Sequence, residues 1–167
     1  LHSWQTHLLA YVKQGDIKPN LALPWNHPET VPHFKIVIDV FQHPALQAPE
    51  EQVSPEGFAL SHYAANRHVM RDNFALGLED VPDGTSNTIL TGEVSTNFRP
   101  WGDPLNWRDP ALGINRSPQG FGGPPQYKGC QFGLVDGSVR YIAEDVDLQV
   151  LRALATPNGG EPVKETW

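Results

Sequence analysis

Cysteine, long apolar runs and basic residues are all scarce in this sequence, and each shortage excludes a class of protein. Cys130 is the only cysteine, so an intrachain disulfide cannot form. No apolar run approaches the roughly 20 residues of a transmembrane helix, and no stretch has the pattern of a signal peptide. The formal net charge of −7 argues against a nucleic-acid-binding surface and against electrostatic docking on anionic membranes.

Proline and glycine, in contrast, are abundant. The 167 residues include 16 Pro and 15 Gly, a composition that favours a loop-rich fold over a helical bundle. The length is enough for one domain with a core of its own. We therefore expect residues 1–167 to form a single domain.

Helices are expected at the two ends of the chain. Ser3–Gln14 has apolar residues at helical spacing, with Ser3 as its cap and Gly15 at its end. Asp145–Thr156 has a second apolar face, with Asp145 or Asp147 as the cap.

Strands are expected between these helices. The β-branched residues of Lys35–Phe41 predict a short strand, and Phe58–Ala65 and Thr88–Val94 predict two more. The long segment Phe98–Pro125 shows little periodicity, but Phe98, Trp101 and Trp107 are expected to make it an ordered loop.

Two Asp-Gly sequences, Asp83-Gly84 and Asp136-Gly137, each adjoin a run of β-favouring residues. Around Asp136-Gly137, the flanks FGLV and SVRYI predict a β-hairpin with a type I′ turn. Both signals are structural, and no catalytic motif accompanies them.

The stretches DVPDGTSNTILTGE, FGLVDGSVRYIAEDVD and LRALATPNGGEPV occur in this order in the C-terminal half of the chain, with HSWQTHLLAYVKQ and YAANRHVM before them. Together they resemble the H-X9-DG prepilin-like family, whose members begin with a prepilin-type cleavage and methylation segment. The resemblance implies an α+β, pilin-like or pseudopilin-like head with a small antiparallel sheet, N- and C-terminal helices and long ordered loops. It also implies export from the cytoplasm, and the family has no established enzymatic activity.

The sequence departs from the family pattern at three places. The family's namesake His falls at position 126, which is Gln126 here, and the usual Cys-Pro is replaced by His43-Pro44. The family's leader and long apolar helix are not in this sequence, so we expect the head alone not to polymerise into a pilus.

Asp80, Asp83 and Asn87 supply the oxygen ligands that calcium prefers, and some pseudopilins bind calcium before their final strands. The same residues also serve turns for backbone reasons, and both interpretations stay open. None of the seven His shows the spacing of a zinc motif. A site assembled from His62, His68 and Glu93 is a further alternative.

Glu93 lies in an apolar strand and needs a partner if it is buried. We predict a structural ion pair with Arg140, on a strand expected nearby. Cys130 opens another strand pattern and is expected to be a small core residue.

The chain is therefore predicted to be a non-catalytic structural or accessory subunit of a periplasmic, extracellular or cell-surface assembly, with other protein subunits as partners. No cofactor is expected apart from the possible calcium. The alternative is an extracellular carbohydrate- or peptide-binding module that uses Trp101 and Trp107. An enzyme would need titratable groups converging in one pocket, and the sequence shows no such set.

Overall fold

A computed structural model describes residues 1–71 and 74–161. The chain forms two compact units. Unit 1 contains Leu1–His62 and Phe98–Asn106, and unit 2 contains Tyr63–Asn97 and the residues from Trp107 onward. The single domain expected from the length stays a prediction, because two compact units can belong to one domain.

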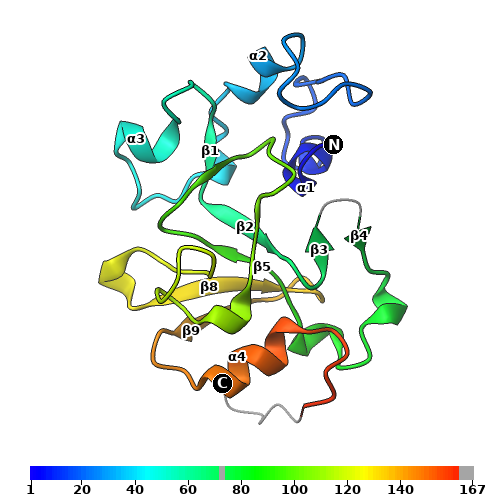
Figure 1. The fold of residues 1–167 in the computed structure, drawn as a ribbon, viewed down its shortest axis with the longest axis vertical. Coiled ribbons are helices and arrows are strands. Elements are labelled where there is room, and N and C mark those ends of the chain that lie inside the picture. The colour runs from blue at the N-terminus through cyan, green and yellow to red at the C-terminus, as the bar shows by residue number, and fades with distance from the viewer. Residues whose placement is uncertain (72–73, 162–167) are drawn as a thin grey trace. The chain divides into compact units, whose positions relative to one another are not determined.

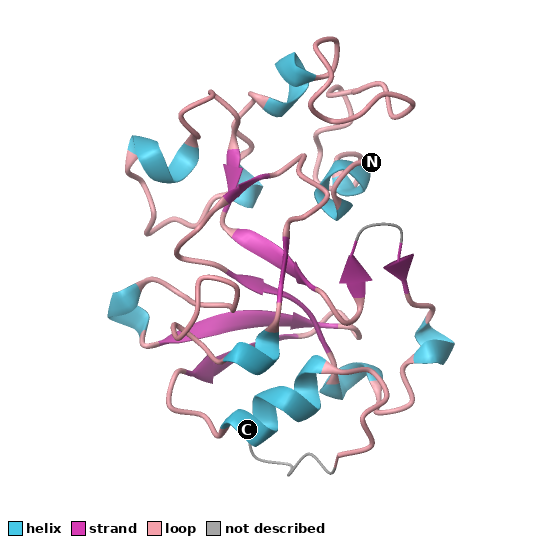
Figure 2. Ribbon diagram, viewed as in Figure 1, coloured by secondary structure: helices cyan, strands magenta, loops and turns pink. Residues whose placement is uncertain are grey.

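The helices of unit 1 are short and are joined by loops (Figures 1 and 2). They are α1 (Trp4–Leu8), α2 (Val31–Phe34) and α3 (Pro49–Gln52). A two-stranded sheet pairs β1 (Leu60–Ser61) with β6 (Arg99–Pro100) in antiparallel fashion. Among the described residues, no helix has the length and apolar character needed to cross a membrane.

Trp101 is the centre of the core of unit 1. Its side chain is fully buried, its ring centroid lies 4.6 Å from that of Phe34, and its Nε1 donates to Ile36 O at 3.0 Å. The residues buried together in this core are Leu9, Phe34, Ile38, Phe41, Ala59 and Trp101.

The prediction of a strand at Lys35–Phe41 is wrong. This segment contains bends followed by a 3₁₀ turn, Asp39–Phe41. Phe34, Ile38 and Phe41 are buried, whereas the β-branched Ile36, Val37 and Val40 are exposed. The alternation that a half-buried strand requires is therefore absent, and packing around Trp101 overrides β-propensity.

The predicted N-terminal helix is confirmed, and it begins after Ser3 as expected. It is shorter than the predicted range Ser3–Gln14. Ser3 caps it by accepting from Gln5 N at 3.1 Å, and the α-helix ends at Leu8. The chain then continues in turns to Lys13, which has a positive φ of 60°. This left-handed residue ends the helical run before Gly15 is reached.

Unit 2 is built on a five-stranded sheet with the order β7-β2-β5-β8-β9. Its strands are β2 (Tyr63–Asn66), β5 (Ile89–Glu93), β7 (Trp107–Arg108), β8 (Gly129–Leu134) and β9 (Val139–Ala143). All pairings are antiparallel except that of β2 with β7. A separate pair joins β3 (Met70–Arg71) to β4 (Phe74–Ala75). The mixed sheets and few helices fit the predicted α+β class.

The C-terminal helix is confirmed as α4 (Leu148–Ala155), with Asp147 accepting from Gln149 N at 2.9 Å. Leu151 and Leu154 on this helix are buried. Asn66 joins the helix to the sheet, since its Nδ2 donates to Ala155 O and Ile89 O, each at 2.7 Å.

The predicted hairpin around Asp136-Gly137 is confirmed, but the prediction that its turn is of type I′ is wrong. Gly137 has a φ of 83°, whereas Asp136 is not among the positive-φ residues. Leu134 N donates to Ser138 O and Gly137 N donates to Leu134 O, so Gly137 occupies the left-handed position of a longer, bulged turn. Asp136 Oδ1 also accepts from Ser138 N at 2.9 Å.

Candidate functional site

Unit 2 contains an open groove beside His68. The groove has a volume of about 520 Å³. Its lining residues are His68, Leu76, Glu79, Asp80, Pro82, Thr156, Pro157 and Asn158. Carboxylates and an imidazole thus lie on a partly apolar surface.

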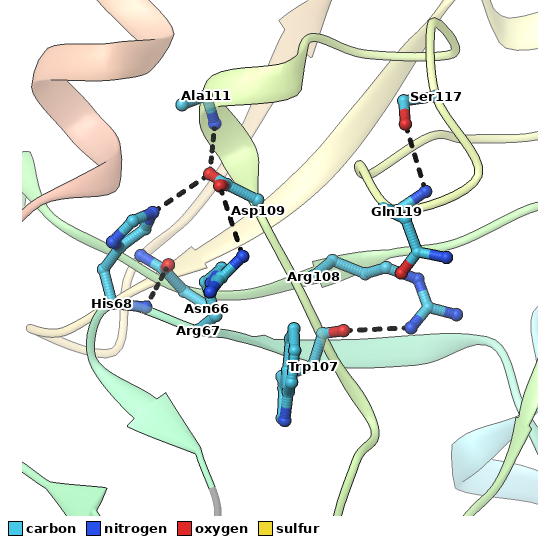
Figure 3. A network of polar contacts seen from close by, with 9 residues as sticks. All are labelled: Asn66, Arg67, His68, Trp107, Arg108, Asp109, Ala111, Ser117 and Gln119. Carbon is cyan, nitrogen blue, oxygen red and sulfur yellow. Dashed lines mark hydrogen bonds and ion pairs between the residues drawn. The ribbon is translucent and has the colours of Figure 1, made fainter.

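Asp109 fixes the position of His68 (Figure 3). His68 Nε2 lies 3.0 Å from Asp109 Oδ1, and because a carboxylate only accepts, Nε2 carries the proton. Oδ1 also accepts from Ala111 N at 3.0 Å, so Asp109 caps the 3₁₀ turn Pro110–Leu112. Arg67 Nη1 lies 3.9 Å from Oδ2.

The backbone around His68 is also held. His68 N donates to Asn66 Oδ1 at 3.0 Å, and the guanidinium of Arg67 stacks 5.0 Å from the Trp107 ring centroid. Asp109 is not among the site residues predicted from the sequence. Its position one residue before Pro110, where Asp is a common cap before a Pro-initiated turn, was the available signal.

His68 and Thr156 are the lining residues of the groove that carry an imidazole and a hydroxyl. Thr156 Oγ1 is buried without a hydrogen-bond partner among the described residues. The groove can therefore contact a small polar group.

The predicted calcium ligands are engaged with the protein backbone. Asp80 Oδ2 accepts from Gly77 N at 3.1 Å. Asp83 accepts from Gly159 N at 2.7 Å and from Gly160 N at 3.1 Å, and Asn87 Nδ2 donates to Asp83 O. Within the described ranges, no group of three or more His, Cys, Asp or Glu is arranged to hold a metal. Calcium at these residues stays a prediction.

Glu93 is buried, and its carboxylate takes the place of a backbone carbonyl as the acceptor for an N–H group of strand β8. Its Oε2 accepts from Gln131 N on β8 at 2.8 Å. Strand β8 lies between β5, which carries Glu93, and β9, which carries the exposed Arg140. The ion pair with Arg140 stays a prediction, since a contact between the two side chains would have to cross β8.

The expected core position of Cys130 is confirmed, because its side chain is fully buried. Burial raises the pKa of the Cys130 thiol well above its usual value, and the nearby Glu93 carboxylate adds to this. The thiol is therefore protonated at neutral pH, which makes it a poor nucleophile.

The two Trp residues of the alternative binding hypothesis belong to different units. Trp101, in unit 1, is buried in the core. Trp107, in unit 2, is half-buried, and the Arg67 guanidinium lies over its ring in a cation–π contact. The Trp101 ring is therefore not an open sugar-stacking face, and Arg67 lies over the ring of Trp107.

The histidines considered for a distributed metal site are also held by other groups. His62 is fully buried in unit 1, whereas His68 and Glu93 belong to unit 2.

Gln126, at the position where the resemblance places the family's His, is exposed in the 3₁₀ turn Pro125–Tyr127.

The second surface feature of unit 2 is strand β9, which forms one edge of the five-stranded sheet. Val139 and Tyr141 on this strand are 68% and 48% exposed. Ile142 is the buried residue of the strand. An open strand edge with exposed apolar side chains is a typical protein-contact surface.

Comparisons with known proteins assign no relative, since no family model, no curated protein and no solved structure matches this sequence.

Proposed function

We propose that this chain is a non-catalytic structural or accessory subunit of an extracytoplasmic protein assembly, with a pilin-like head. The observation that carries the proposal is strand β9, which presents an open sheet edge together with exposed Val139 and Tyr141. A surface of this kind suits association with another protein chain.

The polar residues of unit 2 support a structural role. Asp83, Asp109 and Glu93 each direct a carboxylate oxygen to backbone N–H groups. Carboxylates used in this way stabilise turns and strand ends, and they are less available to act as acids, bases or ligands. The protonated thiol of Cys130 adds no nucleophile.

The resemblance to the prepilin-like family supports the location and the kind of assembly. It favours a pseudopilus, a surface filament or a larger envelope complex in the periplasm or at the cell surface. The carbohydrate- or peptide-binding alternative has less support, because Trp101 is buried in a core rather than displayed.

Purification of the native chain under mild conditions, followed by mass spectrometry of every co-migrating protein, tests the proposal. We expect a reproducible set of partners at fixed ratio. A lone chain after mild extraction from every envelope fraction would contradict the proposal, and screens for glycan and calcium binding would then test the alternative.

A further inference from the structure

Asn158-Gly159 is the one Asn-Gly sequence of the chain, and every other asparagine precedes a residue that has a side chain. The backbone nitrogen that follows an asparagine can attack the carbon of the side-chain amide and close a succinimide ring. A glycine at this position hinders the attack least and gives the backbone the widest choice of angles. The sequence therefore contains a single position at which a following glycine favours this ring closure.

The loop that contains Asn158 is open to solvent. Asn158, Gly159 and Gly160 are exposed, and they follow the end of α4. Within residues 1–71 and 74–161, the structure shows no hydrogen bond that holds the side-chain amide of Asn158. The amide can therefore rotate towards the next backbone nitrogen, and water can reach both groups.

Asp83 binds the nitrogen that would make this attack. Gly159 N donates to Asp83 Oδ2 at 2.7 Å, and Gly160 N donates to Oδ1 at 3.1 Å. Asp83 N in turn donates to Pro157 O at 3.1 Å. A residue 76 positions from Gly159 in the sequence thus makes hydrogen bonds on both sides of Asn158.

A carboxylate in this position opposes loss of the Gly159 proton. The backbone nitrogen attacks only after it has lost that proton, and a negative charge beside the resulting anion raises the free energy of the anion. The hydrogen bond to a charged acceptor must also be broken before the nitrogen can react. Asp83 should therefore slow the ring closure that the sequence favours.

We propose that Asn158 is a site of spontaneous deamidation and that Asp83 sets its rate. Gly159 N loses its proton to solvent and forms a bond to Asn158 Cγ. The bond from Cγ to Nδ2 breaks, and the amide nitrogen takes up a proton from solvent and leaves as ammonia. One water molecule then opens the succinimide at either of its carbonyl carbons, which gives aspartate or isoaspartate. The side chain, the next backbone nitrogen and water are the only reactants.

Each product changes the loop. Aspartate adds a negative charge to a groove whose lining already includes Glu79 and Asp80. Isoaspartate routes the main chain through the former side chain and lengthens the backbone by one carbon atom. The geometry that brings Gly159 N and Gly160 N to the same carboxylate is then lost. The modification therefore releases the segment after α4 from Asp83.

Incubation of the whole chain at mildly alkaline pH, followed by peptide mapping with mass spectrometry, measures the rate at position 158. We expect Asp83→Ala to raise this rate by about tenfold, because a hydrogen bond to a charged acceptor is lost. Asp136→Ala is the matched control, since Asp136 is exposed and also precedes a glycine but accepts from Ser138; it should leave the rate unchanged. An Asp83→Ala rate equal to or below that of the wild type would overturn the role of Asp83.

The wild-type chain in concentrated urea gives a reference that needs no variant. The unfolded chain lacks the bonds to Asp83, so Asn158 should react there at least about tenfold faster than in the folded chain. Asp83→Ala with a wild-type circular dichroism spectrum should react at a rate between these two. A folded wild type that reacts as fast as the unfolded chain would overturn the inference, whether or not Asp83→Ala folds.

Amide hydrogen exchange measured by NMR tests the consequence for the loop. As isoaspartate accumulates, the amides of Gly159 and Gly160 should lose protection together, whereas that of Gln149, which Asp147 holds, should not change. Asn158→Gln, whose longer side chain closes the ring poorly, should show neither the mass change nor the faster exchange. An isoaspartate form that keeps both glycine amides protected would overturn the release of the loop from Asp83.

Discussion

His62 Nδ1 accepts a hydrogen bond from the backbone N–H of His43 at 2.7 Å. The other ring nitrogen, Nε2, lies 2.7 Å from the carbonyl oxygen of Glu51 and donates to it. His62 is fully buried, so the neutral ring joins three segments of unit 1. A second proton would remove the acceptor that His43 N–H uses.

The first prediction is that unit 1 loses stability in mild acid. Burial lowers the pKa of His62 below its ordinary value of 6.5, although Glu51 acts in the opposite direction. The unfolded chain therefore binds the proton first, and stability present above about pH 6.5 falls as the pH drops below it, by at most about 1.4 kcal/mol per pH unit.

Denaturant unfolding between pH 5 and pH 8 measures this dependence. His62→Gln cannot titrate, so its stability should vary less with pH than that of the wild type. His2, whose pKa burial also lowers, contributes the same sign in both chains and cancels in the difference. Equal pH slopes in the two proteins would contradict the assignment.

The second prediction concerns Asp109. Asp109→Ala removes the cap of the turn Pro110–Leu112 and the acceptor of His68, and should destabilise the protein by about 1–3 kcal/mol. Asp109→Asn keeps a capping oxygen and should cost less. Asp145→Ala, at an exposed acid, is the control and should lie within about 0.5 kcal/mol of the wild type. Urea denaturation distinguishes the three variants, and equal losses for Asp109→Ala and Asp145→Ala would contradict the role of Asp109.

The third prediction concerns Asp83, whose carboxylate holds the backbone of Gly159 and Gly160. Asp83→Ala should cost about 1 kcal/mol and speed hydrogen exchange of these two amides. If the carboxylate is committed to this turn, millimolar calcium should leave the Tm of the wild type unchanged. A calcium-dependent rise in Tm that Asp83→Asn abolishes would establish the calcium site instead.

Local signals in the sequence were sufficient for several elements. The hairpin of β8 and β9, the strand β5 and the helix α4 with its Asp147 cap all follow from short-range patterns. Each pattern depends on residues close in sequence, so no knowledge of tertiary packing was needed. The buried state of Cys130 followed from the apolar strand around it.

Tertiary packing decided the features that the sequence did not reveal. Phe34, Ile38 and Phe41 are buried around Trp101, which is distant in the chain, and this arrangement overrides the β-branched residues between them. His62 meets Glu51 and His43 through the fold of unit 1, and Asp109 lies 41 residues from His68. Pairs so far apart have no signature in a single sequence.

The fourth prediction concerns Gly92, where two aromatic rings come close to the backbone. A Cβ at this position would lie 2.7 Å from carbon atoms of both Phe121 and Phe132, whose ring centroids are 5.3 Å apart. Because these rings are in the core of unit 2 and cannot both withdraw, Gly92→Ala should cost about 1–3 kcal/mol.

Gly15→Ala is the matched control for this effect. A Cβ there would lie at an ordinary distance of 3.8 Å from its nearest neighbour, Ala10, and Gly15 is not among the positive-φ glycines. Alanine should therefore be neutral or slightly stabilising, because it reduces the entropy of the unfolded chain. Thermal unfolding of both variants measures the contrast. A Gly92→Ala protein as stable as Gly15→Ala would mean that Phe121 and Phe132 can move apart without loss of core packing.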